Sequence, residues 1–302
     1  MKEATGVGAA LLSSALGGTA IVASRHTAAD VGAFMLGIIR FGVGFAVLLP
    51  VAILHRERWP PPQDWPAVMA LGVLFFCLFP ILFNFSVVYT TAARAALALA
   101  TAPLLTMAVS ALLKVEPLTP RKTAGVLVAT AGVAVSLLSG LPGAPAGAWR
   151  GDLLMVGAAL AMALYTVWSR AYVRRSGTLS FCAVGMGAGV LALFLIYSVL
   201  PAPDIRTGLL QASTSRIWTL VYLGVVCGAF MFILWAFALA RTTPTRVVVT
   251  VTLNPVVAGL LAAFVLDEAV TWNLLVGLLA VACGILLATT ANVRSGWKPR
   301  QR

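Results

Sequence analysis

Residues 101–133 read TAPLLTMAVSALLKVEPLTPRKTAGVLVATAGV, and residues 253–285 read LNPVVAGLLAAFVLDEAVTWNLLVGLLAVACGI. When the second stretch is placed under the first with a shift of 152 residues (255 − 103), proline, acidic, threonine and glycine positions coincide. The positions between them are apolar in both copies, so the chain holds an internal repeat. The coinciding pairs, upstream matches included, are Phe85 with Phe237, Arg94 with Arg246, Pro103 with Pro255, Glu116 with Glu268, Thr119 with Thr271, Gly125 with Gly277, and Gly132 with Gly284.

The repeat extends toward the start of each half at a shift of 145 residues (151 − 6), so that Gly6 falls on Gly151 and Ser24-Arg25 on Ser169-Arg170. One insertion explains the change of shift. A break rich in proline and glycine, Leu141–Pro145, separates the two copies. We therefore expect a first half over 5–139, a second half over 152–291, and a basic tail over 292–302.

The composition indicates an integral membrane protein. The chain has 302 residues, of which 61% are hydrophobic and 10% charged, and its mean hydropathy is +0.99. Soluble domains have roughly 45–50% apolar and about 25% charged residues. A water-soluble core of this size cannot absorb the surplus apolar surface, which must therefore face lipid.

Apolar runs of about 20 residues, the length that crosses a bilayer as a helix, occur ten times. The first run, Thr5 to Ser24, is long for the apolar part of a signal peptide, and we interpret it as a membrane helix. The sequence therefore predicts an all-α protein with ten transmembrane helices. The predicted segments are 5–24, 31–54, 65–88, 92–113, 121–139, 152–172, 179–200, 216–240, 245–266 and 272–291.

Each half holds five segments, and because five is odd the second half enters the membrane from the opposite side. This predicts two inverted five-helix repeats, an architecture of many secondary transporters. Lys and Arg set the orientation, because they concentrate on the cytoplasmic side. With both termini cytoplasmic, fifteen of them lie inside and five outside, and Arg40 lies within a span. The inside set is Lys2, Arg56, Arg58, Lys114, Arg121, Lys122, Arg170, Arg174, Arg175, Arg241, Arg246, Arg294, Lys298, Arg300 and Arg302; the outside set is Arg25, Arg94, Arg150, Arg206 and Arg216.

Several classes of site are disfavoured by the sequence. Cys77, Cys182, Cys227 and Cys283 each lie inside an apolar run, which is typical of packing residues rather than of disulfides or metal ligands. We expect no metal and no cofactor. The net charge of +12 is explained by topology, so we expect no nucleic-acid partner. No Walker-type sequence and no catalytic pair of Asp, His or Cys within the membrane is present, which argues against an ATP-driven pump and against an enzyme.

The repeated stretch resembles the EamA repeat of the drug/metabolite transporter superfamily. The likeness rests on a proline within the helix, an acidic residue with a threonine three positions on, and two spaced glycines, and it occurs in both halves. Trp272 departs from the pattern, because the family has a small residue or proline there. The resemblance implies ten helices, a central cavity between the halves, and export toward the periplasm across a bacterial inner membrane. Within the superfamily the chain is most similar to amino-acid and metabolite exporters, and above all to exporters of aromatic amino acids.

Arg40 is the clearest candidate for substrate binding. It lies within the apolar run Phe34–Gly42, and a charge at depth in a span costs about 2.5–3.5 kcal/mol on insertion scales. A guanidinium at this depth is suited to clamp a substrate carboxylate. The alternative is a structural arginine that binds backbone carbonyls at a helix break, and an arginine in this helix is common across the family.

Aromatic and polar side chains at helical spacing form the rest of the predicted site. The aromatics are suited to stack against an apolar or aromatic substrate, although each of them taken singly is better explained by packing or lipid contact. The candidates are Phe79, Phe83, Tyr165, Trp168 and Trp235, with Phe75, Phe76, Phe230 and Phe237 beside them and Asn84 and Asn254 as the polar residues within spans.

Three prolines are predicted to kink helices and to serve as hinges. Pro80, Pro103 and Pro255 each remove a backbone donor within an apolar segment, which frees the carbonyl four residues earlier. Gly185 and Gly189 have the spacing of a close helix–helix contact.

None of the nine acidic residues lies in the middle of a predicted span. Because proton-coupled carriers commonly use a buried carboxylate, we expect facilitated transport. The leading interpretation is a monomeric alternating-access exporter of amino acids, aromatic or otherwise apolar, or of related small metabolites, with the lipid bilayer as its only other partner. Alternatives are a multidrug, nucleoside or nucleotide-sugar carrier, and a membrane scaffold that transports nothing. A phosphate-bearing substrate is disfavoured because Arg40 is the only cation that the sequence places at depth.

Overall fold

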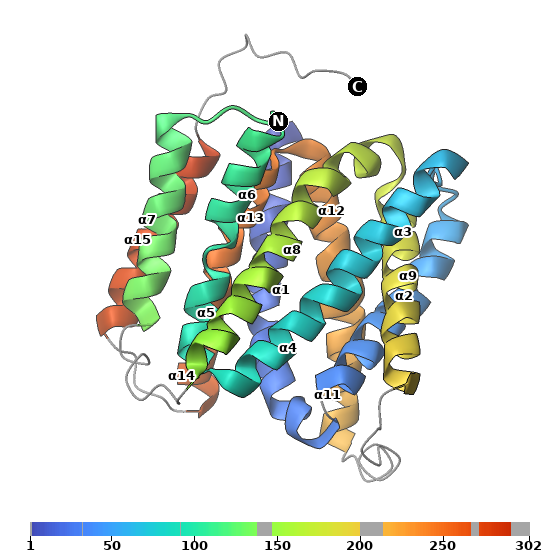
Figure 1. Cartoon of the computed structure of the whole chain (residues 1–302), viewed down its shortest axis with the longest axis horizontal. Coiled ribbons are helices and arrows are strands. Elements are labelled where there is room, and N and C mark those ends of the chain that lie inside the picture. Colours follow the sequence, from blue (N-terminus) through green and yellow to red (C-terminus); the bar gives the residue numbers. More distant parts are fainter. Residues whose placement is uncertain are drawn as a thin grey trace.

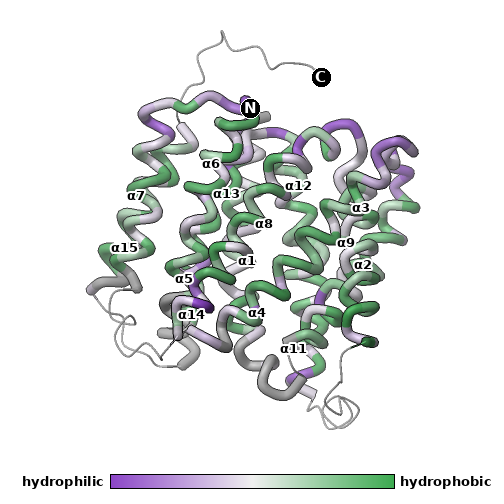
Figure 2. Tube along the Cα trace, in the orientation of Figure 1, coloured by the Kyte–Doolittle hydropathy of each residue, from purple (hydrophilic) through white to green (hydrophobic). Residues whose placement is uncertain are grey.

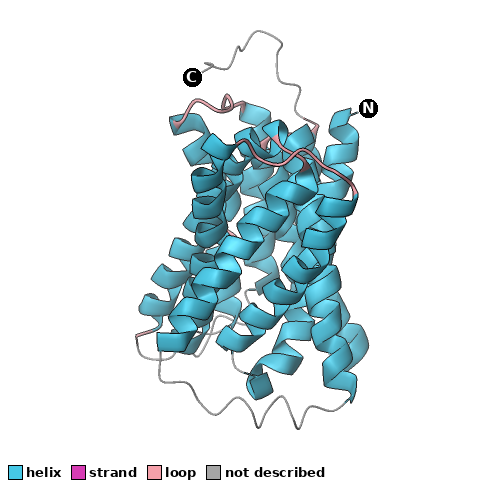
Figure 3. Ribbon diagram, turned by 90° about the vertical axis from the view of Figure 1, so that its right-hand side faces the viewer, coloured by secondary structure: helices cyan, strands magenta, loops and turns pink. Residues whose placement is uncertain are grey.

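The protein is described here by a computed structural model, which covers residues 2–31, 33–90, 92–137, 147–199, 214–266 and 272–290. Every regular element in these ranges is helical (Figure 3). The main helices are α1 (Lys2–Val31), α2 (Ala33–Leu54), α3 (Trp65–Val73), α4 (Phe79–Tyr89), α5 (Ala92–Leu99), α6 (Ala102–Leu112), α7 (Pro120–Leu137), α8 (Ala148–Arg175), α9 (Thr178–Val199), α11 (Thr214–Gly224), α12 (Met231–Arg241), α13 (Pro244–Val249), α14 (Leu253–Leu266) and α15 (Trp272–Thr289).

The helices form one bundle in which apolar residues line most of each helix and hydrophilic residues gather toward the ends (Figure 2). Within the described residues, six helical runs are long and apolar enough to cross a membrane, and Leu97–Leu112 and Leu275–Thr289 are shorter apolar helices. The described residues of the predicted segments lie in helical runs, and the first helix continues further than predicted, to Val31. A helical membrane fold is thereby confirmed.

Four of the helical runs are interrupted near their middles, at corresponding places in the two halves. Leu74–Leu78 (η2) joins α3 to α4, and Val225–Phe230 (η4) joins α11 to α12; both are π-helical. Ala100-Thr101 separates α5 from α6, and the 3-10 segment Thr250–Thr252 (η5) separates α13 from α14. The 152-residue shift places η2 on residues 226–230 (74 + 152 to 78 + 152), which lie within η4. Pro80, Pro103 and Pro255 each follow an interruption closely, as their missing backbone donors predict.

Helices that are distant in sequence pack side by side (Figure 1). Helix α7 packs along α15, and α2 packs along α9. Helix α1 lies against α12 and α14, and in a matching way α8 lies against α4 and α6. The contacts between the first and second half of the chain are therefore extensive.

Glycines permit the closest of these approaches. A Cβ added at Gly125 on α7 would lie 2.7 Å from the Gly284 carbonyl oxygen on α15, and one added at Gly284 would lie 2.6 Å from the Gly125 carbonyl oxygen. The predicted helix contact of Gly185 and Gly189 is confirmed, because both lie against Gly72 on α3. Without a hydrophobic force between helices in lipid, such small-residue contacts are a main source of packing energy.

One end of the bundle is defined by the start of α1, and we call it the N-side. The end of α2, the starts of α3 and α9, the α6–α7 connection, the end of α8 and the start of α13 all lie at this end, which is uppermost in Figure 1. The start of α8, the α4–α5 connection and the start of α11 lie at the opposite end.

Candidate functional site

A cluster of stacked aromatic rings occupies the interior where the two π-helical segments meet their neighbours. Phe75 is at its centre. The Phe75 ring stacks on Tyr165 of α8, with centroids 4.4 Å apart and planes inclined by 18°, and on Phe79, with centroids 5.1 Å apart. Phe76 and Phe232 meet Phe75 edge-on. Stacked and edge-on pairs each contribute about 0.5–1.5 kcal/mol beyond area burial, so the cluster is a rigid part of the core, built from rings of the type that stacks on another flat ring.

Arg40 lies beside this cluster on α2. Its guanidinium carbon is 5.4 Å from the centroid of the Phe41 ring, and Phe41 in turn meets Phe76 and Phe232 edge-on. One guanidinium nitrogen donates to the carbonyl oxygen of Cys227 at 3.1 Å, and Cys227 lies within the π-helical segment η4. The Arg40 Nε is buried and has no hydrogen-bond partner within the described structure. The carbonyl contact matches the structural role considered for Arg40, while its remaining donors are suited to bind a substrate carboxylate.

The other predicted site residues fall into two groups. Phe79, Tyr165 and Trp235 belong to or pack on the buried core that contains the aromatic cluster, and the Trp235 Nε1 is a buried donor without a partner in the described residues. Phe83 lies 6.0 Å from Phe79, ring centre to ring centre, and packs on a smaller cluster with Met155.

The second group lies away from the aromatic cluster. Trp168 is 44% exposed, which places it at the surface of the bundle that meets lipid or solvent. Asn254 packs against Gly17 of α1, where its amide nitrogen is positioned to donate to the Ser14 carbonyl oxygen at 2.7 Å. Asn254 thus has a clear role in joining α1 to α14. Asn84 is half-buried on α4.

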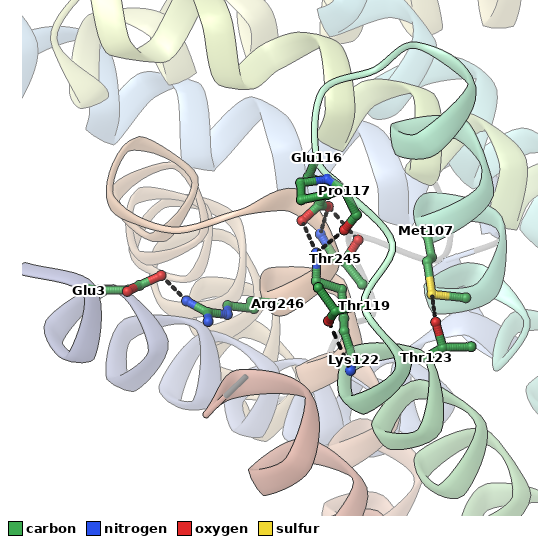
Figure 4. Close-up of polar contacts among 9 residues, drawn as sticks. All are labelled: Glu3, Met107, Glu116, Pro117, Thr119, Lys122, Thr123, Thr245 and Arg246. Carbon is green, nitrogen blue, oxygen red and sulfur yellow. Dashed lines mark hydrogen bonds and ion pairs between the residues drawn. The ribbon is translucent and has the colours of Figure 1, made fainter. Parts of the chain in front are cut away.

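A second polar site, not predicted from the sequence, lies at the N-side (Figure 4). Glu116, in the α6–α7 connection, is only 4% exposed and forms an ion pair with Lys122, N to O 2.8 Å. Its other oxygen accepts hydrogen bonds from the backbone N–H of Thr245, at 2.9 Å, and from the Thr245 hydroxyl. Lys122 is 1% exposed and also donates to the Pro117 carbonyl oxygen. A carboxylate from the first half of the chain is therefore held at the start of α13 in the second half.

The pKa of Glu116 reflects this environment. Burial acts to raise the pKa of the carboxyl, but the charge of Lys122 and the hydrogen bonds from Lys122 and Thr245 outweigh burial and lower it below its usual value. Glu116 is accordingly ionised at neutral pH, and it acts as an acceptor for both halves of the chain.

Further polar contacts join the halves at the same end. Glu3 of α1 pairs with Arg246 of α13. Glu57, after α2, accepts from the backbone N–H groups of Leu179, at 2.7 Å, and Ser180 at the start of α9. Next to Glu57 lies an open depression of about 510 Å³, which is lined by Glu57, Val173, Arg174, Ser176, Gly177, Thr178, Ala240 and Arg241.

The burial of Lys122 and Arg246 corrects one inference from the sequence. Both were assigned to exposed connections, which left Arg40 as the only cation placed at depth; the structure buries Lys122 and leaves Arg246 only 4% exposed. The error arose because short polar connections look solvent-exposed in sequence, whereas Lys122 is paired with Glu116 of its own connection and Arg246 with Glu3 of α1. The coincidence of Glu116 with Glu268 was the one available signal.

Some predicted features lie outside the described residues, among them Glu268, the break at Leu141–Pro145 and the tail 292–302. Within the described ranges, no group of three or more His, Cys, Asp and Glu side chains is placed to hold a metal ion. Cys77, Cys182 and Cys227 are free and buried, and Cys283 is free and exposed.

Comparison with known proteins identifies a protein family that this chain matches. The sequence profile described as the EamA-like transporter family matches residues 4–138 and again residues 149–290. A protein of Archaeoglobus fulgidus named an uncharacterized transporter is 25% identical over 271 residues, which cover 89% of this chain and 93% of that protein.

Two further likenesses cover nearly the whole chain. A protein of Streptantibioticus cattleyicolor named a probable terminal-alkyne amino-acid exporter is 27% identical over 288 residues, covering 95% of this chain and 94% of that protein. A crystal structure superposes with a TM-score of 0.80 at 23% identity, covering 95% of this chain and 98% of the other. At that identity the superposition shows a shared fold.

Proposed function

Since the chain belongs to the EamA-like transporter family, we propose that it is an exporter of amino acids, aromatic or otherwise apolar, or of closely related small metabolites, working by alternating access. Its membership makes it a membrane transporter of small molecules. Beyond family membership we propose four properties: the substrate class, the inverted architecture, the orientation in the membrane and the energetics of transport.

The substrate class rests on the pairing of Arg40 with the aromatic cluster. An amino acid presents a carboxylate, which a guanidinium binds, and a side chain, which stacked rings bind when it is apolar. Phe41 contacts both Arg40 and the Phe75 cluster, which brings the guanidinium and the rings to one part of the bundle. The name of the Streptantibioticus cattleyicolor relative, a probable amino-acid exporter, is in keeping with this class.

The inverted architecture is supported by reciprocal contacts. If the halves are related by a twofold axis in the membrane plane, a contact between two positions must recur between their counterparts. Gly6 lies against Ala238 and Thr242, and its counterpart Gly151 lies against Ser86 and Thr90, which are the counterparts of Ala238 and Thr242. On α7 and α15, Gly125 lies against Gly284, and Gly132 lies against Gly277, with each pair being the counterpart of the other. The domains that follow are 5–139 and 152–291.

The orientation we propose places the N-side in the cytoplasm of a bacterial inner membrane, with both termini inside. Lys and Arg concentrate in the N-side connections, as cytoplasmic connections require. The proposed mode is facilitation, because the two buried carboxylates of the described residues, Asp64 and Glu116, both lie at the N-side ends of helices. We propose a monomer as the working unit.

A competition panel tests the substrate class. Purified protein in liposomes is assayed for uptake of radiolabelled phenylalanine, with unlabelled amino acids, nucleosides and nucleotide sugars as competitors. We expect aromatic and large apolar amino acids to compete and nucleosides not to compete. Competition by nucleosides alone would favour a nucleoside carrier, and no flux of any compound would favour a scaffold.

An imposed pH gradient tests facilitation in the same vesicles. We expect uptake to stop at equal concentrations inside and outside. Accumulation driven by the gradient alone would contradict a facilitative mode.

A further inference from the structure

The contact between Glu116 and Thr245 joins the two halves of the chain through a buried carboxylate. Glu116 belongs to the connection after α6, and Thr245 is the second residue of α13, 129 residues later in the chain. Two donors of Thr245, the backbone N–H and the hydroxyl, converge on one carboxylate oxygen, and Lys122 holds the other oxygen (Figure 4). A charge-assisted hydrogen bond is about twice as strong as a neutral one, so Glu116 holds Thr245 more strongly than a neutral acceptor would.

Lys122 and Thr245 have different roles at Glu116. Lys122 is in the same half as Glu116, so their ion pair neutralises the buried carboxylate without joining the halves. Removing either charge leaves the other buried and unpaired, which is costly to folding. Only the bonds to Thr245 cross between the halves, and only these have to break if α13 moves away from α6.

The two halves must separate at the cytoplasmic end for a cytoplasmic substrate to enter. Ser110 on α6 lies directly beneath the link, because its carbonyl oxygen accepts from the backbone N–H groups of Val115 and Glu116, and the Ser110 side chain is fully buried. In the described structure, therefore, the N-side is closed at this place.

We propose that Glu116 is a positioning residue of the transport cycle: with Lys122 as its counter-ion, it clasps the start of α13 through Thr245, keeps the N-side closed, and releases Thr245 each time this side opens. This inference rests on the proposed alternating-access function. It assigns a moving contact to a residue that the sequence alone placed in an ordinary connection.

Thr245→Val tests whether the contact with Glu116 keeps the N-side closed. It removes the hydroxyl donor, keeps the backbone donor, and leaves the Glu116–Lys122 pair intact, so the protein is expected to fold. The matched control is Thr106→Val, because Thr106 is equally buried on α6 and its hydroxyl bonds only to Ala102 in its own helix. Glu116→Gln is a weaker test, because it leaves Lys122 buried opposite a neutral amide.

Cysteine labelling measures, without any substrate, how often the N-side opens when the Glu116–Thr245 contact is weakened. In full-length protein with the four native cysteines replaced, Ser110→Cys is exposed to a membrane-impermeant maleimide from the N-side of sealed vesicles. We expect Thr245→Val to speed labelling by about tenfold, which is the loss of one hydrogen bond to a charged group. Thr106→Val should leave the rate unchanged. Ser86→Cys, equally buried toward the opposite end, should stay protected in every background. Equal labelling rates in Thr245→Val and Thr106→Val would overturn the clasp.

Transport kinetics separate a moving clasp from a purely structural contact. A carrier biased toward N-side opening should show a lower KM for substrate offered from the N-side together with a lower maximal rate per folded carrier. A purely structural role predicts fewer folded carriers with both constants unchanged, and that result would overturn the proposal. If Thr245→Val speeds labelling but the protein transports nothing, the Glu116–Thr245 contact still holds the N-side closed, and the proposed function is refuted instead.

Discussion

The packing of α7 on α15 makes a prediction that can be worked from distances. In Gly125→Ala the new Cβ would lie 2.4 Å from the Ala288 backbone nitrogen and 2.7 Å from the Gly284 carbonyl oxygen. Ordinary contact starts near 3.4 Å, so the helices must part by about 1.0 Å (3.4 − 2.4). A radial gap of about 0.5–1 Å forfeits a quarter to a half of each dispersion contact nearby. Overpacking typically costs about 1–3 kcal/mol, and alanine returns up to about 1 kcal/mol of helix propensity. We expect a net loss of about 1–2 kcal/mol in the free energy of unfolding.

The assay is reversible unfolding in mixed micelles, followed by circular dichroism as the fraction of sodium dodecyl sulfate rises. The control is Gly8→Ala on α1, where nothing lies within 4 Å of an added Cβ, and it should be neutral or slightly stabilising. Gly284→Ala should resemble Gly125→Ala, because its Cβ would lie 2.6 Å from the Gly125 carbonyl oxygen. The double variant should cost less than the sum, since one separation of the helices accommodates both methyl groups. If Gly125→Ala behaves like Gly8→Ala, the close packing is refuted.

Three further predictions concern Arg40, the aromatic cluster and Glu116. Arg40→Ala should lower transport by about tenfold or more while folded protein is retained, since a lost charge-assisted hydrogen bond is worth about 1.5–3 kcal/mol; loss of folded protein in size-exclusion chromatography would instead establish the Cys227 contact as structural. Tyr165→Leu should raise the KM of aromatic substrates more than that of leucine, and Tyr165→Phe should change neither, because it keeps the stack on Phe75; equal effects on all substrates would count against ring stacking. The stabilisation from Glu116 should be fully present above the usual glutamate pKa of about 4.3 and be lost as pH falls through the lowered pKa of the folded protein. Unfolding curves at pH 7 and below pH 4 should therefore diverge more in the natural protein than in a double variant, Glu116→Gln with Lys122→Met, and parallel curves would contradict the assignment.

Sequence reasoning was most successful where membrane physics leaves few choices. A span needs a certain length of apolar residues, so the ten segments fell on helices, and prolines that lack a donor lie next to the interruptions near Pro80, Pro103 and Pro255. The π-helical segment at Val225–Phe230 had no such signal, because Phe232 stands where the first half has Pro80. No interruption was therefore predicted there from the sequence.

The inner and outer faces of a membrane helix are harder to tell apart, because both the core and the lipid are apolar. Tyr165 and Trp168 share a helix and a similar chemistry, yet one is buried in the aromatic cluster and the other is 44% exposed. Glu116 shows the converse difficulty. A carboxylate in a short connection looks solvated in sequence, whereas Glu116 is buried between Lys122, six residues further on, and Thr245 of the second half.

Counterflow is the direct test of alternating-access transport. Only a carrier with one site that opens alternately to the two sides exchanges substrate on one side for substrate on the other. Liposomes containing the purified protein are loaded with unlabelled phenylalanine and diluted into a trace of radiolabelled phenylalanine without any ion gradient. We expect a transient overshoot of label inside the loaded vesicles, which is absent from empty vesicles and much reduced in Arg40→Ala. Label that only equilibrates, at the same rate with and without internal substrate, would contradict alternating access by this protein.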